Sequence, residues 1–499
     1  MRPGFHPARS AEEARVHFGV VEDPALSSSP DREPLSAVDY AWLRMDEPAN
    51  LMHINGVLVL DRPVDMERIR AIVERRLLAI PRFRRRVVIP KRGRPYWEDD
   101  PDFNLDHHLA RIVLPAPGGD AELKQVVEGL ITRQFDPDRP MWSFHVVDNF
   151  RGGSVLMARL HHCLGDGVAL MLVLLSLTDR TPDADPALPN PFLDLYRSQP
   201  EHDLEDIRSL AEEIMPEGMK LMLLPAEAFR SVRRGLKGIL ATGAFGRLLL
   251  RPSDPHTSFR GPLGIPKCVA WSEALPLDEV KAVGKALGGT VNDVLLAAMA
   301  GGLRRYLAQH NEPPEDLNFR AAMPVNLRTM ERMSELGNRF GLIFLSLPVG
   351  IADARERLAE LARRARSLKR SLEPVVVYAI LSTLGWVPHV LQKLVVTIFA
   401  TKATAVMTNV PGPKEVLYLA GQPIQDIFFW VPQAGRVGLG VAICSYAGRV
   451  RIGVGTDAGL VPDPEAVVAG FQAEFAEMRR LAGLAEAPAE PAAVAQAVQ

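Results

Sequence analysis

Two adjacent histidines precede an Asp-Gly pair in the stretch LHHCLGDGVAL, residues 160–170. A neutral imidazole can take up a proton and return it near neutral pH, so His161 and His162 are candidates for general base catalysis on a hydroxyl or an amine. Asp166 is placed to cap a following helix, and the glycines on either side of it permit a tight bend. A polar turn would therefore explain the aspartate and the glycines, but it leaves the paired histidines without a structural task.

Other chemistries fit the same stretch less well. Cys163 adjoins His162, but consecutive side chains of an extended segment point in opposite directions, so we do not expect a Cys–His nucleophile pair. The two histidines lack spaced third and fourth ligands, and no metal site is expected. A second histidine pair, His107 and His108, is expected on a surface strand.

The elements around the histidine stretch follow strand and helix periods in turn, which predicts a mixed α/β fold. Residues 152–160 read as a strand that leads into the histidines, and residues 168–178 read as a buried helix that follows them. A second block of the same style begins at residue 267, with a long helix at 290–310. Near its end, residues 437–446 and 449–457 are separated by Ala447-Gly448, the length of a tight hairpin.

The chain length of 499 residues suggests two or three packed units. Composition changes divide it into a mobile N-terminal arm (1–33), an N-terminal domain with the histidine stretch (34–180), a Pro-rich linker with an amphipathic helix (181–265), a C-terminal domain (266–482) and an Ala/Pro/Glu-rich disordered tail (483–499).

Net charge and cysteine content restrict the partners and the compartment. A formal charge of −2 provides no field that would attract nucleic acid, and nucleic acid is not an expected partner. The basic clusters at 81–97 and 363–372 are expected to be solvated faces, with contact to a ligand's phosphates as the alternative. Three separated cysteines fit a reducing compartment, so we expect a cytoplasmic protein. Polar residues interrupt the apolar stretch 375–407, and no transmembrane helix is expected.

The helix expected at residues 227–250 has a basic stripe beside an apolar one. Its basic residues are Arg230, Arg233, Arg234 and Lys237. Such a helix suits an anionic lipid surface, although a linker helix packed on the two domains has the same pattern.

Several motifs together resemble a known family. HHCLGDG matches the HHxxxDG signature of the CoA-dependent acyltransferase superfamily, which includes chloramphenicol acetyltransferase-like enzymes and peptide-synthetase condensation domains. In addition, FDPDRPMW, TVNDVLL, AMPVNLR, LGNRFG and TNVPGP follow the order of motifs in bacterial wax ester synthase/acyl-CoA:diacylglycerol acyltransferases. The resemblance extends over roughly residues 34 to 480.

This resemblance implies two chloramphenicol-acetyltransferase-like domains with a tunnel between them. It implies that His162 is the general base, that His161 supports it, and that Asp166 with Gly167 maintains the loop. The Thr290–Asp293 spacing itself predicts a capping box, whereas the resemblance places Asn292 near the substrate.

The implied reaction transfers a long-chain acyl group from acyl-CoA, as a substrate, to diacylglycerol or a fatty alcohol. No cofactor is required, and the protein is expected to associate peripherally with a membrane or lipid droplet. Two alternatives remain open at this point: a condensation-type or polyketide-linked acyltransferase with a carrier-bound donor, and a non-catalytic lipid-binding protein of the same fold.

Overall fold

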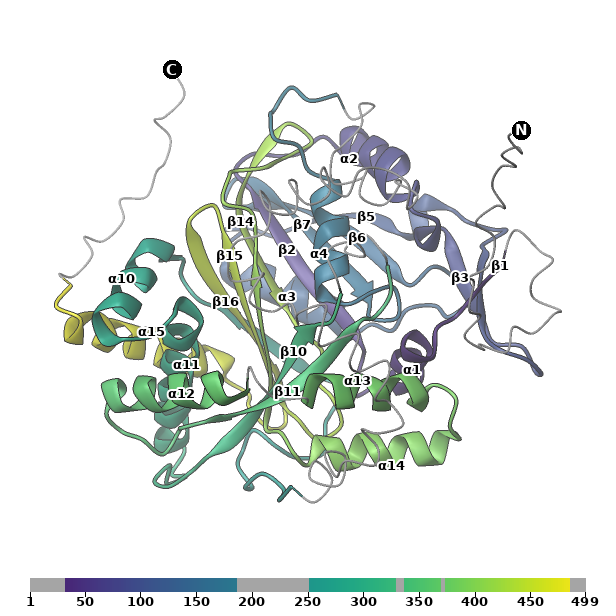
Figure 1. The fold of residues 1–499 in the computed structure, drawn as a ribbon. Helices are drawn as coiled ribbons and strands as arrows, with labels where there is room; N and C mark the ends of the chain where they lie inside the picture. Colours follow the sequence, from purple (N-terminus) through teal and green to yellow (C-terminus); the bar gives the residue numbers. More distant parts are fainter. Residues whose placement is uncertain (1–31, 186–250, 329–335, 369–372, 485–499) are drawn as a thin grey trace, which may run out of the picture.

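The computed structural model describes residues 32–185, 251–328, 336–368 and 373–484. The expected N-terminal arm, the amphipathic helix at 227–250 and all but the first two residues of the expected tail lie outside the described residues. Within them, two large mixed sheets lie beside one another, and most of the helices cover their outer faces (Figure 1).

The first sheet contains strands from both halves of the chain, in the order β13-β14-β2-β7-β6-β5. All neighbours are antiparallel except the β5–β6 pair. Its strands are β2 (His53–Leu60), β5 (Leu109–Val113), β6 (Trp142–Phe150), β7 (Gly153–His161), β13 (Tyr418–Leu419) and β14 (Gln422–Trp430).

The second sheet follows the order β11-β10-β12-β15-β16-β8, and β9 pairs with β16. Its strands are β8 (Lys267–Trp271), β9 (Leu275–Pro276), β10 (Phe319–Asn326), β11 (Phe340–Leu347), β12 (Ala405–Pro411), β15 (Leu439–Tyr446) and β16 (Arg449–Asp457). A small third sheet contains β1 (Arg32–Pro34), β4 (Tyr96–Asp99) and β3 (Arg85–Val88).

Helices surround the sheets and connect their strands. The α-helices are α1 (Ala37–Met45), α2 (Met66–Ile72), α3 (Asp120–Ile131), α4 (Gly167–Ser176), α10 (Leu277–Leu287), α11 (Val291–Gln309), α12 (Ala354–Leu368), α13 (Glu373–Leu384), α14 (His389–Ala400) and α15 (Pro464–Leu481). A π-turn at Val73–Leu77 continues α2, and 3₁₀ turns occupy Pro81–Phe83 and Leu105–His107.

Local signals in the sequence explain several of these boundaries. Helix α11 begins at the expected capping box, in which the Thr290 side chain accepts from the Asp293 N–H and the Asp293 carboxylate accepts from Thr290. The expected β15–β16 hairpin turns at Ala447 and Gly448, whose φ angles of 46° and 76° are both positive, as a tight two-residue turn between twisted strands requires.

Strand β14 links the two sheets. It lies in the first sheet, although the sequence places it within the segment 266–482 that was expected to form the C-terminal domain. On β14, Trp430 donates its indole N–H to the Ala270 carbonyl of β8 at 3.2 Å. Asp426 of β14 forms a buried ion pair with Arg451 of β16. The second half of the chain therefore supplies a strand to the first sheet, and the two halves do not meet only at their surfaces.

The pair His107–His108 departs from expectation. His107 is exposed but ends a 3₁₀ turn, and His108 is buried just before β5, so the expectation of a surface strand is wrong for both. Its Nδ1 lies 2.9 Å from the Trp142 carbonyl, and its ring stacks on the Trp142 indole at 4.7 Å between centroids. Burial lowers the pKa of His108, which fits a neutral core residue.

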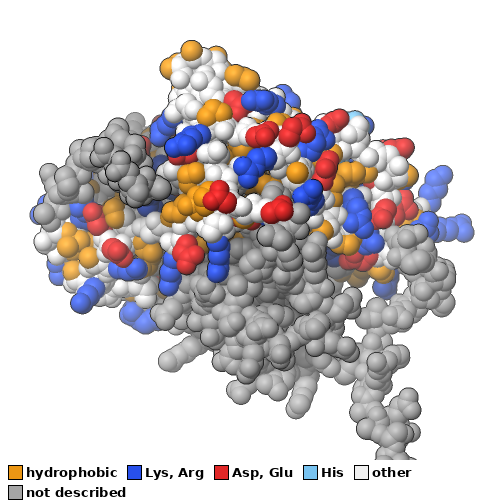
Figure 2. Space-filling view, turned by 90° about the horizontal axis from the view of Figure 1, so that it is seen from above, with side chains coloured by type: hydrophobic (Ala, Val, Ile, Leu, Met, Phe, Trp, Pro, Cys, Tyr) orange, Lys and Arg blue, Asp and Glu red, His pale blue; other side chains and the backbone are white. Residues whose placement is uncertain are grey.

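The surface seen from above intersperses acidic and basic side chains (Figure 2), in keeping with the small net charge. Among the described residues, no single helix is both long and apolar enough to cross a membrane. Helices α10 and α11 together would meet the length and composition required, but they meet at a bend of 89°.

We expect Asp426→Ala to lower the free energy of unfolding by up to about 3–5 kcal/mol, because the largely buried Arg451 guanidinium loses its buried carboxylate and keeps only the exposed carboxylate of Glu273 at 3.9 Å. Urea unfolding measures the change. Glu477→Ala is the control, since it removes an exposed partner of Arg480 and should cost no more than about 1 kcal/mol. Equal effects of the two substitutions would contradict the role assigned to the buried pair.

Candidate active site

An apolar cavity of about 230 Å³ lies between the two halves of the chain. Strands β2 and β7 and helix α4 line it from the first half, and β10, β11, β12, α13 and α14 line it from the second. His162, Asp166 and Gly167 are among its lining residues. The histidine stretch thus faces a cavity that neither half encloses alone.

The hydrogen bonds of His162 define which of its ring nitrogens can act as a base. Its Nδ1 lies 2.8 Å from the Asn338 Oδ1. The Asn338 amide nitrogen donates to the His162 carbonyl at 2.7 Å and to the Asp39 carboxylate at 2.8 Å, so Oδ1 is the acceptor side of this amide. Nδ1 of His162 must therefore carry the proton, and Nε2 retains its lone pair.

Asn338 is itself held by a carboxylate from helix α1. The Asp39 Oδ1 also accepts the Asn338 backbone N–H at 3.0 Å. Asp39 is buried, and Arg82, whose guanidinium lies 3.5 Å from the Asp39 Oδ2, balances its charge. The Arg82–Asp39–Asn338 chain therefore orients the imidazole through its Nδ1 side.

Aromatic side chains exclude water from the faces of the His162 ring. The Trp42 indole stacks on the imidazole with 4.2 Å between centroids and 12° between planes, and Phe340 lies at 5.6 Å. Burial lowers the pKa of His162 to about 4, although the charge of Asp166 and the Asn338 hydrogen bond act in the opposite direction. His162 is therefore neutral at pH 7 and able to accept a proton.

Asp166 performs two structural tasks in the loop. Its Oδ1 accepts the Ala169 N–H at 3.1 Å and so caps helix α4, as the sequence predicts. Its Oδ2 accepts the Arg339 N–H at 2.9 Å and pairs with the guanidinium of Arg328, whose side chain is fully buried. The second task connects the loop to the other half of the chain.

Gly337 completes this connection. Its φ of 106° lies in the region that favours glycine, and its carbonyl accepts from Arg328. A Cβ at this position would lie 3.3–3.4 Å from side-chain atoms of Arg82 and Asp39. By contrast, a Cβ at Gly167 would meet nothing within 4 Å, so Gly167 leaves open space beside the start of α4.

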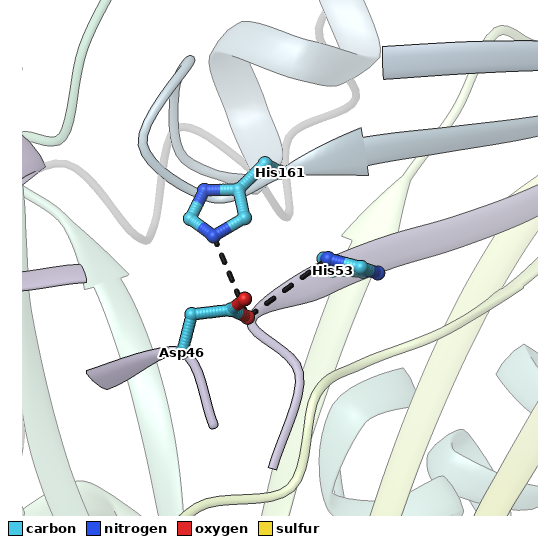
Figure 3. A group of neighbouring side chains, drawn as sticks. All are labelled: Asp46, His53 and His161. Carbon is cyan, nitrogen blue, oxygen red and sulfur yellow. Dashed lines mark ion pairs between the residues drawn. The ribbon is translucent and has the colours of Figure 1, made fainter. Parts of the chain in front are cut away.

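His161 turns away from the cavity and belongs to a second cluster, with Asp46 and His53 (Figure 3). Its Nδ1 accepts the Cys163 N–H at 3.0 Å, so the ring proton resides on Nε2, 3.5 Å from the Asp46 carboxylate. His53 lies opposite His161 in the β2–β7 pair, and its Nε2 is 3.9 Å from the same carboxylate oxygen.

The protonation of this cluster does not suit a metal ion. The His53 Nδ1 faces the Arg159 guanidinium at 3.4 Å and can only accept, so its Nε2 also carries the proton. Metal binding at either Nε2 would require a ring with neither nitrogen protonated. Burial, together with the nearby His161 and Arg159, lowers the pKa of His53 well below its ordinary value. The cluster therefore anchors the end of β7, next to His162 in the chain.

Asn292 and Cys163, the other residues considered from the sequence, both lie outside the cavity lining. Asn292 does not line the cavity, but its Oδ1 accepts from the Asn409 amide at 3.0 Å, and Asn409 does line it. Cys163 is fully buried outside the cavity lining, and burial raises the pKa of its thiol well above the ordinary value. A thiol with that pKa is a poor nucleophile.

Sequence reasoning missed Asn338, Arg328 and Asp46 as partners of the histidine loop. The first two lie within the motifs LGNRFG and PVNLR, which the resemblance includes without roles for single residues. Asp46 lies in LSAVDYAWLRMDEPANLMHINGVLVL, residues 35–60, which also resembles the family, again without a role for this residue. The motifs therefore marked Asn338 and Arg328, but only the fold shows that they contact the histidine loop.

Solved structures share this fold. The chain matches a wax ester synthase/diacylglycerol acyltransferase from Marinobacter aquaeolei VT8 with a TM-score of 0.64 and 23% identity, over 91% of this chain and 100% of that one. It also matches the first condensation domain of the calcium-dependent antibiotic synthetase with a TM-score of 0.55 and 15% identity, over 91% and 97%. The architecture is thus that of two chloramphenicol-acetyltransferase-like domains, with the apolar cavity between them.

Sequence comparisons name the family. The wax ester synthase/diacylglycerol acyltransferase catalytic domain matches residues 35–295, and the C-terminal domain of the same family matches residues 336–479. A Mycobacterium tuberculosis protein assigned as a diacylglycerol O-acyltransferase is 30% identical over 480 residues, covering 92% of this chain and 99% of the relative. The chain belongs to the wax ester synthase/diacylglycerol acyltransferase family and is an acyltransferase, as the motifs predict.

We expect Asp166→Ala to cost more than a helix cap alone. It removes a cap worth about 0.5–2 kcal/mol and also removes the Asp166 partner of the buried Arg328 guanidinium, a loss that costs up to about 3–5 kcal/mol. Asp166→Asn keeps a capping side chain and should fall between the wild type and the alanine variant in urea unfolding. Asp65→Ala, which removes only the exposed cap of α2, is the matched control. A loss at Asp166 no larger than at Asp65 would show that the Arg328 pair contributes nothing.

Proposed function

We propose that this protein transfers a long-chain acyl group from acyl-CoA to the hydroxyl of diacylglycerol or a long-chain alcohol, with His162 as general base. The observation that carries the proposal is the neutral His162, whose Nε2 retains its lone pair beside an apolar cavity. The cavity walls, which include Leu342, Phe344 and Val377, are suited to an acyl chain.

The reaction needs only one titratable group. The Nε2 of His162 takes the hydroxyl proton while the oxygen attacks the thioester carbonyl, and a tetrahedral intermediate forms. The C–S bond then breaks, and the imidazolium returns its proton to the departing CoA thiolate. A low pKa makes the imidazolium a strong acid at this step. The acyl group and the proton are both accounted for, so this reaction requires neither an acyl-enzyme nor a cofactor.

The neighbouring residues take positioning roles in this proposal. Asp166 fixes the loop and favours the imidazolium through its charge, and His161 anchors the loop from below. Gly167 leaves room for substrate at the start of α4, and Asn292 acts through Asn409, which reaches the cavity.

Two alternatives are less well supported. A carrier-bound donor would relate the chain to condensation domains, but that likeness is one of fold at 15% identity, whereas the family match covers both halves of the chain. A non-catalytic lipid-binding protein would not need the Asn338 contact that leaves a basic nitrogen in the cavity. Because the proposed acceptors are insoluble in water, we also propose peripheral association with a membrane or lipid droplet.

We expect His162→Ala to lower turnover of acyl-CoA by roughly 10²–10⁴-fold, because that is the usual contribution of a positioned general base. Release of free CoA thiol, measured separately with a long-chain alcohol and with diacylglycerol, reports the activity and the acceptor. Cys163→Ala is the matched neighbour and should retain substantial activity. Wild-type turnover by His162→Ala, or an acyl thioester on Cys163 found by mass spectrometry, would refute the mechanism.

The depressed pKa of His162 predicts an unusual pH profile. The limb of kcat/KM that reports His162 should fall near pH 4 rather than near the ordinary value of 6.5, so activity should stay level between about pH 8 and pH 5.5. The folded-state pKa lies below the unfolded one, so the stability contributed by neutral His162 is complete above about pH 6.5 and is lost as pH falls towards 4. His162→Gln should therefore make the fall in Tm below pH 6.5 shallower, and a limb near 6.5 in the wild type would contradict this environment.

A further inference from the structure

Helix α14 and the turn before it carry an apolar surface that faces solvent. Eight large hydrophobic side chains are exposed among the described residues, and four of them fall within nine consecutive positions of this segment. Their exposed fractions are 44% for Trp386, 82% for Val390, 46% for Leu391 and 55% for Leu394. We call these four residues the α14 face. Single exposed hydrophobic residues are common on protein surfaces, but half of those in the described residues lie together on this short segment.

The opposite side of the same helix lines the substrate cavity. Val395, Val396, Phe399 and Ala400 are lining residues, and α14 lies at the lower edge of the molecule in Figure 1. One helix, about 10 Å across, therefore separates the α14 face from the cavity that receives the lipid substrates.

Cationic side chains border the α14 face. The guanidinium of Arg94 lies 5.1 Å from the centre of the Trp386 ring, and Lys91 and Arg92 are exposed on the same β3–β4 connection. Ile89 of that connection is 58% exposed. Lys393 is exposed on α14 itself, where Glu47 balances its charge at 2.8 Å. Arg94 thus lies against the α14 face, Lys91 and Arg92 are exposed on the same connection, and none of the three has a carboxylate partner in the ion pairs of the described residues.

We propose that the α14 face binds an anionic lipid surface and brings the cavity wall against the layer that holds the acceptor. This proposal rests on the proposed function, because a water-insoluble acceptor makes such a surface useful. An apolar centre with a tryptophan at its edge, and an exposed cationic connection beside that tryptophan, matches the acyl boundary and the anionic headgroups of a lipid layer.

The experiment measures binding of the full chain to vesicles of phosphatidylcholine with and without phosphatidylglycerol, by flotation. Val390→Gln/Leu394→Gln should lower partitioning at least about tenfold, because both exposed side chains lose apolar burial. The matched control is Val113→Gln/Val416→Gln, which changes exposed apolar residues elsewhere and should bind as the wild type does. All variants should keep the wild-type Tm, since the changed side chains are exposed.

A second variant tests the cationic border. Lys91→Gln/Arg92→Gln/Arg94→Gln should remove the preference for phosphatidylglycerol, with about fivefold weaker binding per charge, and leave binding to pure phosphatidylcholine unchanged. Vesicle binding is independent of turnover, so an inactive protein that still binds through the α14 face would overturn the proposed function and not this surface.

Three results would overturn the proposal. One is unchanged flotation of Val390→Gln/Leu394→Gln. Another is loss of flotation only when Arg230, Arg233, Arg234 and Lys237 of the segment 227–250 are replaced by Gln. The third is a dimer in lipid-free buffer that Val390→Gln/Leu394→Gln dissociates, which would make the α14 face a contact between copies of the chain.

Discussion

A base that works inside an apolar cavity must be neutral, oriented and unbonded at one nitrogen, and His162 meets these conditions through the Asn338 amide. The amide can accept from Nδ1 only because its nitrogen side is occupied by the His162 carbonyl and the Asp39 carboxylate. His162 and Asn338 are 176 positions apart and lie in the two different family domains. The site therefore exists only when both halves of the chain are folded together.

The same constraint explains the buried charges around the loop. Asp39 and Asp166 are both buried carboxylates, and each has an arginine partner, Arg82 and Arg328. Buried ion pairs of this kind contribute little net stability, because desolvation offsets their attraction. Their effect is on position: each fixes a polar group that an apolar wall could not hold. The Asp39–Arg82 and Asp166–Arg328 pairs therefore orient the His162 imidazole more than they stabilise the fold.

The sequence predicted the features that depend on neighbouring residues. The cap at Asp166, the capping box at Thr290 and the hairpin at Ala447-Gly448 all follow from local spacing, whereas the choice of His162 over His161 as the base came from the family resemblance. The features that it did not predict depend on contacts between distant segments. His108 has an ordinary polar context in the sequence, and only the stacking of its ring on Trp142 explains its burial. The placement of β14 in the first sheet is of the same kind, because a largely apolar strand suits either sheet.

The placement of β14 in the first sheet also affects where substrates can enter the cavity. Ile427, Phe428 and Phe429 of β14 line the cavity, while β14 pairs with β2 on one side and contacts β15 and β16 on the other. The Asp426–Arg451 pair and the Trp430–Ala270 hydrogen bond hold this strand to the second sheet. Opening the cavity along β14 would break sheet hydrogen bonds and a buried ion pair together. Helices α13 and α14 cover the cavity by side-chain packing and are not strands of either sheet. Packed side chains can separate without breaking the hydrogen bonds of a sheet. We therefore expect substrate to enter on the helical side, where the apolar surface of α14 lies.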